Sequence, residues 1–323
     1  MSTDTSKDLI KSRVDFVLVF SVDNANPNGD PGYDNRPRMD AYTGHGFVTD
    51  VCIKRKIRNR VEVIKKLTDG YNIWVRSGTY LRDTVDKYGG DKDKLCKQFF
   101  DIRAFGGVLT SDSDSGGEEG QTGETEKKTK KSGKNVKSKV SQIRGPVSIQ
   151  YAKSVAPVIV EDDEITRVCP TKFDPKKPDK QTEMGRKKRV PFAVYVTKGS
   201  VSARLAEGDK GTGFSVEDLN LLKTAMETLF LNDESTARPI GSMIVQKGVF
   251  FTHSLSKDGD EAVHKTLDRL KVEFVGKDEN GVKVDKPEKA RDMGCYKISL
   301  DKTDLPSSIQ IEEFGDYAAV VDA

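Results

Sequence analysis

The first side chains with chemical potential lie in a polar, irregular segment near the start of the chain. Asn24, Asn26 and Asn28 alternate there, and Arg36 and Arg38 follow in the same segment. Amides donate and accept hydrogen bonds, and guanidinium groups pair with phosphates. This set suits the phosphates and 2′-hydroxyls of a polynucleotide better than a small anion. We therefore predict that these five residues contact RNA.

The same segment also permits a metal interpretation. Asp23 and Asp30 could hold Mg²⁺ for nuclease chemistry, and the alternating asparagines outline a calcium-binding loop. Calcium is excluded because the first position of that loop lacks Asp and its twelfth is Asn35 instead of Glu. Two carboxylates among asparagines are more often turn formers, so we expect no metal and no other cofactor.

A basic segment follows this loop. From Lys54 to Lys66 there are seven basic residues and one acidic residue. Isoleucines at helical spacing predict a helix from about residue 50 to 67, with Thr49 or Asp50 as its N-cap. Its N-terminus, together with Lys54, Arg55 and Arg58, would attract phosphates. A solvated basic face with no ligand stays open as the alternative.

The composition of two stretches predicts insertions into the fold. Residues 111–142 hold an acidic and then a basic block with almost no apolar residue, which predicts a disordered polyampholyte loop. Residues 157–192 are rich in proline and carry eight basic against three acidic residues between Lys172 and Arg189. Because extended stretches flank this second segment, we expect a hairpin-like arm that projects from the body.

The remaining chain alternates between strand and helix patterns. Apolar, β-branched runs predict strands or extended segments at 13–22, 72–76, 146–160, 192–205, 243–252, 269–275, 294–300 and 309–321; helices are expected at 92–102 and 215–231. The order predicts an α+β fold, a modified ferredoxin-like or RRM-like sheet. We expect one such domain over residues 1–323.

Composition excludes several classes of protein. Of 323 residues, 35% are hydrophobic and 33% charged, and the net charge is only +3, as in ordinary globular domains. Four dispersed cysteines and three histidines give no zinc spacing and no disulfide framework. There is no apolar run of membrane-spanning length and no secretory leader, so we expect a cytoplasmic protein without a membrane partner.

Longer motifs narrow the interpretation to a family. NPNGDPGYDNRPRMD (26–40) and TGHGFVTDVCIKRKIRN (43–59) resemble the crRNA-binding backbone subunit of type I CRISPR Cascade complexes, in the RAMP superfamily and particularly in its type I-C form. RAFGGV (103–108), RGPVSIQ (144–150), ITR (165–167), MGRKKRVPFAVY (184–195) and TGFSVEDLNLL (212–222) follow in the order of that family. The insertion at 111–142 departs from the family, which has a short connection there.

This resemblance implies an RRM-like palm with a projecting thumb, which binds guide RNA without reading its sequence and polymerises along it. The implied partners are crRNA, complementary target DNA, further copies of the chain and other Cascade subunits, with no enzymatic activity. The matching motifs extend the RNA-contacting role to Arg103, Phe105, Gly106, Arg144, Thr166, Arg167, Met184, Arg186 and Lys187.

Two rival functions stay open. A metal-dependent endoribonuclease of the same superfamily would draw on Asp23, Asp30 or His45. A single-RRM regulator that reads a short RNA would need aromatic residues exposed on its sheet, where Phe250 and Phe251 are the candidates, although we expect both to lie in the core.

Overall fold

The structure of the protein is a computed structural model that describes residues 8–109, 142–173, 175–177, 179 and 181–315. The polyampholyte insertion predicted at 111–142 falls outside the described residues except for its last one. Strands are β1 (Val14–Ala25), β2 (Gly29–Asp30), β3 (Arg36–Pro37), β4 (His45–Val48), β5 (Gly106–Val108), β6 (Gln142–Arg144), β7 (Val147–Ile149), β8 (Ala152–Pro157), β9 (Glu161–Arg167), β10 (Glu183–Val201), β11 (Met243–Thr252), β12 (Leu270–Phe274), β13 (Tyr296–Leu300) and β14 (Gln310–Phe314). Helices are α1 (Asp50–Lys65), α2 (Leu81–Lys87), α3 (Lys92–Gln98), α4 (Phe100–Phe105), α5 (Ala203–Ala206), α6 (Val216–Glu227) and α7 (Val263–Leu267), with 3₁₀ turns η1 (Pro31–Tyr33), η3 (Pro287–Lys289) and η4 (Met293–Cys295).

A large antiparallel sheet organises the chain. Its strand order is β14-β11-β1-β10-β8-β4, with β7 and β9 also paired to β10. Strand β1 lies at the centre, in antiparallel register with β10 on one side and β11 on the other. The mixed α and β composition expected from the sequence is confirmed. No helix in the described part of the chain combines the length and apolarity needed to cross a bilayer.

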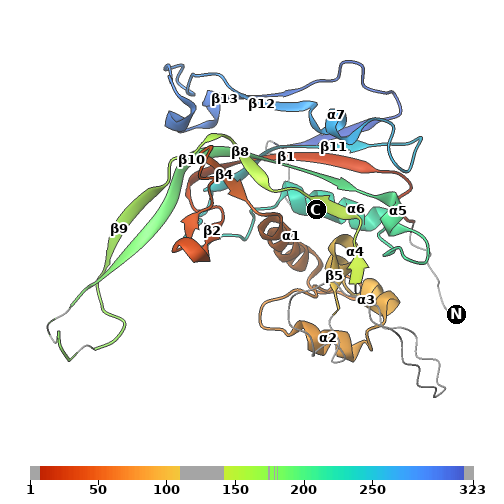
Figure 1. Cartoon of the computed structure of the whole chain (residues 1–323), viewed down its shortest axis with the longest axis horizontal. Helices are drawn as coiled ribbons and strands as arrows, with labels where there is room; N and C mark the ends of the chain where they lie inside the picture. The colour runs from red at the N-terminus through yellow and green to blue at the C-terminus, as the bar shows by residue number, and fades with distance from the viewer. Residues whose placement is uncertain (1–7, 110–141, 174, 178, 180, 316–323) are drawn as a thin grey trace, which may run out of the picture.

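Both faces of the sheet are covered at its centre. On one face, α1 and α6 pack over alternate β1 side chains such as Phe16, Leu18 and Phe20. On the other face, the β12–β13 hairpin covers Val17 and Val19, as the layers in Figure 1 show. A strand buried on both faces is expected to be apolar at nearly every buried position, which explains the apolar run from Phe16 to Phe20 in β1.

The covered face decides what the aromatic residues of β11 can do. Phe250 and Phe251 are 1% and 0% exposed, and Phe251 packs under the β12–β13 layer. Their expected place in the core is confirmed. These rings are therefore closed to a nucleic acid.

The two main helices begin where their capping residues predict. The Thr49 side chain accepts a hydrogen bond from the N–H of Cys52 at the start of α1. At the start of α6, Ser215 and Asp218 form a reciprocal capping box. Both helix predictions are confirmed to within a few residues at the C-terminal end.

Three local expectations differ from the structure. Residues 72–76 form no strand, because the N–H groups of Trp74 and Val75 donate to the Asp101 carboxylate at 2.8 and 3.1 Å instead of to a neighbouring strand. The helix expected at 92–102 is broken at Phe99, whose extended backbone ends α3 and opens α4. The polar segment around Asn24 to Arg38, expected to be irregular, contains the short strands β2 and β3.

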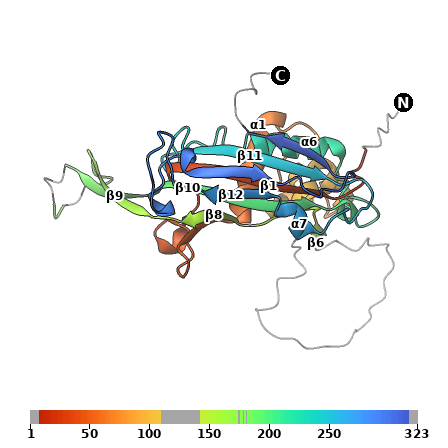
Figure 2. The same cartoon turned by 90° about the horizontal axis from the view of Figure 1, so that it is seen from above.

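An antiparallel hairpin projects from one end of the sheet. Strand β9 pairs with the first part of β10, from Arg167 opposite Glu183 to Glu161 opposite Arg189. Figures 1 and 2 show this hairpin extending well beyond the layered body. We call it the arm. Because β10 continues from the arm into the sheet beside β1, the arm shares its backbone with the core.

Candidate nucleic-acid interface

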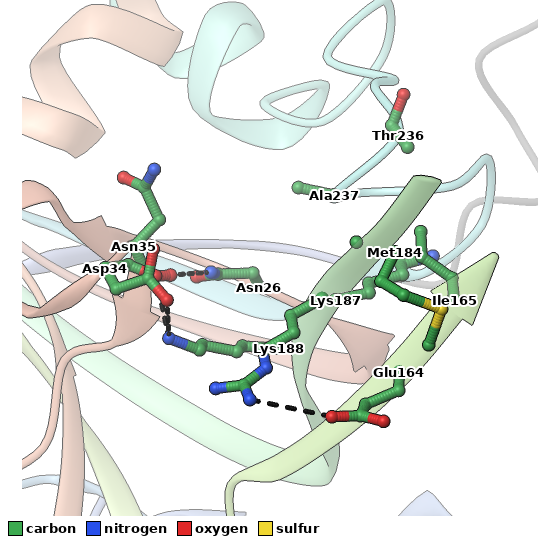
Figure 3. A pocket seen from close by; sticks show the side chains of 12 residues that line it. Asn26, Asp34, Asn35, Glu164, Ile165, Met184, Lys187, Lys188, Thr236 and Ala237 are labelled. Atoms are coloured by element: carbon green, nitrogen blue, oxygen red, sulfur yellow. Dashed lines mark hydrogen bonds and ion pairs between the residues drawn. The ribbon is translucent and has the colours of Figure 1, made fainter. Parts of the chain in front are cut away.

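A cleft of about 700 Å³ lies where the arm leaves the body, and we call it the arm cleft. Three segments far apart in the sequence form its walls, as Figure 3 shows: the β1–β3 region, the arm and the loop before β11. The lining residues are Asn26, Asp34, Asn35, Glu164, Ile165, Met184, Gly185, Arg186, Lys187, Lys188, Thr236 and Ala237. Predicted contacts from the first loop and from the arm therefore meet in one place.

Asn26 ties together the two walls contributed by the body. Its side-chain Nδ2 donates to the Asn35 carbonyl at 2.6 Å, and its backbone N–H donates to the Ala237 carbonyl at 2.9 Å. The residue is 7% exposed. Asn26 therefore fixes the shape of the arm cleft, in addition to the contact predicted for it.

The arm carries its charges as facing rows. The register places four acidic residues of β9 opposite four basic residues of β10. Arg189 pairs with Glu161 and Asp163 at 2.6 Å, and the hydrogen bond to Asp163 is the main reason that its pKa is raised. These pairs hold the two strands together and neutralise much of the basic block.

Two cations of the arm cleft are held only weakly, or not at all, by ion pairs among the described residues. Arg186 meets Glu164 only at 3.5 Å, and both side chains are about two-thirds exposed. Within the described residues, no ion pair engages the ammonium group of Lys187. Both groups are therefore available to a phosphate.

Lys188 clamps the arm to the body. Its ammonium group bonds the Asp34 carboxylate at 2.6 Å and the Asp34 carbonyl at 3.0 Å. The Lys188 hydrogen bond lowers the pKa of Asp34 below its ordinary value. Neither residue was predicted as part of the site, since a contact between positions 34 and 188 leaves no signal in a single sequence.

One wall of the arm cleft is apolar. Met184 and Ile165 are 64% and 49% exposed although both are large apolar side chains. Thr166 donates its hydroxyl to the Met184 sulfur at 3.4 Å. Arg167 lies farther out and is bound by Glu183 and by the Cys169 carbonyl. Met184, Arg186 and Lys187 thus gather at the cleft, whereas Arg167 serves the outer part of the arm.

The other members of the first loop mostly fix its conformation. Asn28 accepts from the Thr49 N–H at 3.0 Å, and Arg38 pairs with Asp30 at 2.9 Å. Asn24 accepts from Arg189 on the arm. Arg36 is half exposed, with Asp162 at 3.9 Å. Of these four, Arg36 is the most open to a further ligand.

A second cleft, of about 520 Å³, lies where α4 turns at Gly106 into the paired strands β5 and β6, and we call it the turn cleft. It brings together four predicted contacts: Lys54, Phe105, Gly106 and Arg144. The Lys54 ammonium lies 5.7 Å from the centre of the Phe105 ring and 3.0 Å from Asp50. Phe105 is only partly buried, and a cation beside an aromatic ring that solvent can reach suits a nucleotide.

Gly106 has a structural explanation. Its φ of +73° is unfavourable for any residue with a side chain, and a Cβ would lie 2.2 Å from the Ile143 carbonyl oxygen. Tight pairing of β5 with β6 therefore requires glycine here. The glycine is explained without the RNA contact predicted for Gly106, which stays a prediction.

The prediction that α1 presents a row of cations to phosphates needs correction. Arg58 does not present its charge to solvent, because its Nε lies 2.8 Å from the fully buried Asp101 carboxylate. Arg55 donates to the Val75 carbonyl, and burial lowers its pKa. These partners come from distant segments, so helical spacing alone could not reveal them. On this helix only Lys54 lines one of the two clefts.

Arg103 is likewise internal. It is 2% exposed and forms two hydrogen bonds to the Asp218 carboxylate, at 3.0 and 2.7 Å. It also donates to the Cys96 carbonyl at 2.7 Å. This position argues against the predicted RNA contact and assigns Arg103 to the core.

Two of the residues considered for a metal site or for nuclease chemistry, Asp30 and His45, form hydrogen bonds within the protein. Asp30 accepts from Arg38 and from the Gly32 N–H, and His45 Nδ1 bonds the Ser154 carbonyl at 2.8 Å. Over the residues that the structure describes, no three His, Cys, Asp or Glu side chains are grouped to hold a metal ion.

Comparison with known proteins identifies the family. The family description "CRISPR-associated protein Cas7" matches residues 12–301, which is most of the chain. The chain belongs to the Cas7 family. A Cas7 protein of Haloferax volcanii is 27% identical over 249 residues, which cover 71% of this chain and 67% of that protein.

Solved structures give a weaker likeness. Two chains, from structures titled "CRISPR RNA-guided surveillance complex" and "CRISPR RNA-guided surveillance complex, pre-nicking", are each 14% identical to this Cas7 protein. Their TM-scores are 0.43 and 0.42, over 76% of this chain and 71% and 79% of the other chains. Membership of the family rests on the match over residues 12–301, and the type I-C form stays a prediction.

Proposed function

We propose that this Cas7 protein binds CRISPR guide RNA and polymerises along it as the backbone of a type I-C Cascade surveillance complex that recognises complementary target DNA. The observation that carries the proposal is the arm cleft. It joins Asn26 of the first loop to Met184, Arg186 and Lys187 of the arm, all four of which were predicted as RNA contacts.

The chemistry of the arm cleft suits a nucleotide. The exposed Met184 and Ile165 side chains offer an apolar wall on which a base can pack, and the less committed Arg186 and Lys187 offer cations to its phosphates. Phosphate contacts position a nucleic acid without reading its sequence. Base pairing by the guide would then supply the specificity for target DNA.

The sheet supports an RRM-like palm. The order β11-β1-β10-β8, with α1 after β1 and α6 before β11, follows the split βαβ arrangement of ferredoxin-like sheets. The arm is inserted between β8 and the sheet-forming part of β10, where a thumb would leave such a palm. We infer that the arm is the thumb and that it separates short segments of paired target.

The alternative functions draw less support. A regulator that reads RNA on the central strands of an open sheet would need aromatic residues exposed on those strands, yet Phe251 of β11 lies beneath the β12–β13 layer. For an endoribonuclease, Asp30 is already paired with Arg38. We therefore infer a binding role without catalysis, while the cytoplasmic location and the lack of a cofactor stay predictions from the sequence.

The test is assembly on RNAs of increasing length and unrelated sequence. Sedimentation should show the number of bound copies rising in proportion to RNA length, with equal affinity for permuted sequences. One copy per RNA at every length, or selection of one sequence, would contradict a polymerising backbone. Cleavage of bound RNA upon addition of Mg²⁺ would favour the endoribonuclease instead.

A further inference from the structure

A third cleft, of about 550 Å³, lies at the β4–β8 edge of the sheet, and we call it the edge cleft. It is lined by Asp40, Thr43, His45, Gly46, Phe47, Tyr151, Lys153 and Ser154. It shares no lining residue with the arm cleft or with the turn cleft. None of the RNA contacts predicted from the sequence lies in it.

The edge cleft opens on the sheet face that the helices leave free. Gly46 faces the helices, because a Cβ there would meet the Tyr195 hydroxyl at 2.4 Å. Side chains alternate along a strand, so Phe47 faces the opposite way, as does Lys153 in register with it. The β12–β13 layer covers the middle of that face and leaves Lys153 and Tyr151 exposed.

An aromatic platform forms the floor of the edge cleft. The rings of Phe47 and Tyr151 are nearly parallel, at an angle of 11°, and their centres are 5.9 Å apart. This is an offset stack, a favourable arrangement for two rings. Tyr151 is nevertheless 50% exposed, so much of its ring is open to a third planar group.

The polar groups around the platform are held in defined orientations. His45 Nδ1 bonds the Ser154 carbonyl, which makes Nδ1 the donor and leaves Nε2 for another partner. The Asp40 Oδ1 atom accepts from the N–H groups of Tyr42 and Thr43, and the Thr43 bond is the main reason that the pKa of Asp40 is lowered. Lys153 adds one exposed cation.

We propose that the edge cleft binds an unpaired base of a single-stranded nucleic acid, stacked on Tyr151, with the adjacent phosphate at Lys153. A nucleobase is planar and has both donors and acceptors on its edge, which matches an aromatic floor rimmed by an imidazole, a carboxylate and an ammonium group. This site goes beyond the guide-binding function and does not depend on the arm cleft.

The lining favours a base over the two other ligands that such a cleft could take. A free phosphate gains nothing from the ring pair and would depend on Lys153 alone, beside the Asp40 carboxylate, whereas a nucleotide adds the stacking of its base. A peptide or a second copy of the chain would be expected to cover a broad apolar patch, whereas the apolar part of this cleft is the one ring pair. A single stacked base needs only that pair.

The probe is an oligothymidylate with one 5-iodouracil, photo-crosslinked to the purified, RNA-free chain and mapped by mass spectrometry. The crosslink should fall on Tyr151 or Phe47 and persist in the Arg186→Ala/Lys187→Ala variant. Tyr151→Ala should weaken binding at this site about fivefold or more, the range for loss of one stacked base, while Tyr151→Phe should keep it. The matched control is Tyr80→Ala, which removes an equally large ring that is 77% exposed on another surface.

Three outcomes would overturn the proposal. One is equal binding by the Tyr151→Ala and Tyr80→Ala variants, and another is a crosslink confined to the arm cleft. The third is a Tyr151→Ala variant that binds the probe normally but no longer self-associates in sedimentation, which would make the edge cleft a protein contact. Because the readout is the mapped crosslink at Tyr151, it can fail while guide binding through the arm cleft succeeds.

Discussion

Arg103 and Asp218 form two parallel hydrogen bonds, at 3.0 and 2.7 Å, in the interior of the protein. Asp218 also accepts from the Ser215 N–H in the capping box of α6. The pair therefore joins the end of α4 to the first turn of α6, two elements more than a hundred residues apart. Its place in the core gives Arg103 a purpose other than the RNA contact suggested by its motif.

Arg103→Ala should destabilise the fold by about 3–5 kcal/mol, because it leaves the Asp218 carboxylate buried without its cation. Chemical denaturation measures this loss. Arg204→Ala is the control, since Arg204 and Asp258 form an exposed pair whose loss should change stability little. A stable Arg103→Ala protein with weakened RNA binding would restore the original prediction.

Lys54 and Arg58, one turn apart on α1, should respond differently to alanine. Arg58→Ala removes the partner of the buried Asp101 and should lower the melting temperature. Lys54→Ala should leave stability nearly unchanged and reduce the salt slope of RNA binding by about 0.7, the value for one lost phosphate contact on a single strand. If both variants changed RNA binding alike with normal stability, α1 would be the phosphate-binding face predicted from the sequence.

These pairs show where sequence reasoning succeeds and where it ends. Local patterns located β1, α1 and α6, because apolar periodicity and the caps Thr49 and Ser215 act over a few residues. The partners of Arg58 and Arg103 come from distant segments, so their burial could not be foreseen. Loop chemistry and motif likeness assigned Asn26 and Lys187 to RNA contacts, but neither could show that the two share a cleft or that Asp34 and Lys188 clamp the arm beside them.

Removal of residues 110–141 should leave the fold intact. The two ends of this segment are neighbours, because Val108 pairs with Gln142 in the β5–β6 ladder. A short turn of Asn and Gly should therefore close the hairpin, provided that the buried Leu109 is kept. The protein without residues 110–141 should have the same melting temperature and RNA affinity as the parent. A fall in soluble yield or in melting temperature would show that the segment stabilises the fold.

Acid should reveal the role of Asp260. Burial alone would raise the pKa of this carboxyl, yet hydrogen bonds from the Ser254, Leu255 and Ser256 N–H groups and from Ser308 outweigh it and lower the pKa to about 2. A lowered pKa stabilises the folded state fully above the ordinary value of 3.8 and loses that effect as the pH falls through about 2. Asp260→Asn should be less stable than the parent at pH 7, and the difference should shrink between pH 4 and pH 2. A difference that is independent of pH would contradict this account.

The central claim is that the arm cleft holds guide RNA, and the salt dependence of RNA binding tests it most directly. Arg186→Ala/Lys187→Ala should lower the salt slope by about 1.4, for two lost phosphate contacts, and weaken binding of unrelated RNAs alike. Lys271→Ala/Lys297→Ala removes the same charge from exposed positions on β12 and β13, away from the cleft, and is the control. We predict a reduced slope for the first variant and an unchanged slope for the second. Equal slopes for the two variants and the parent would contradict RNA binding in the arm cleft.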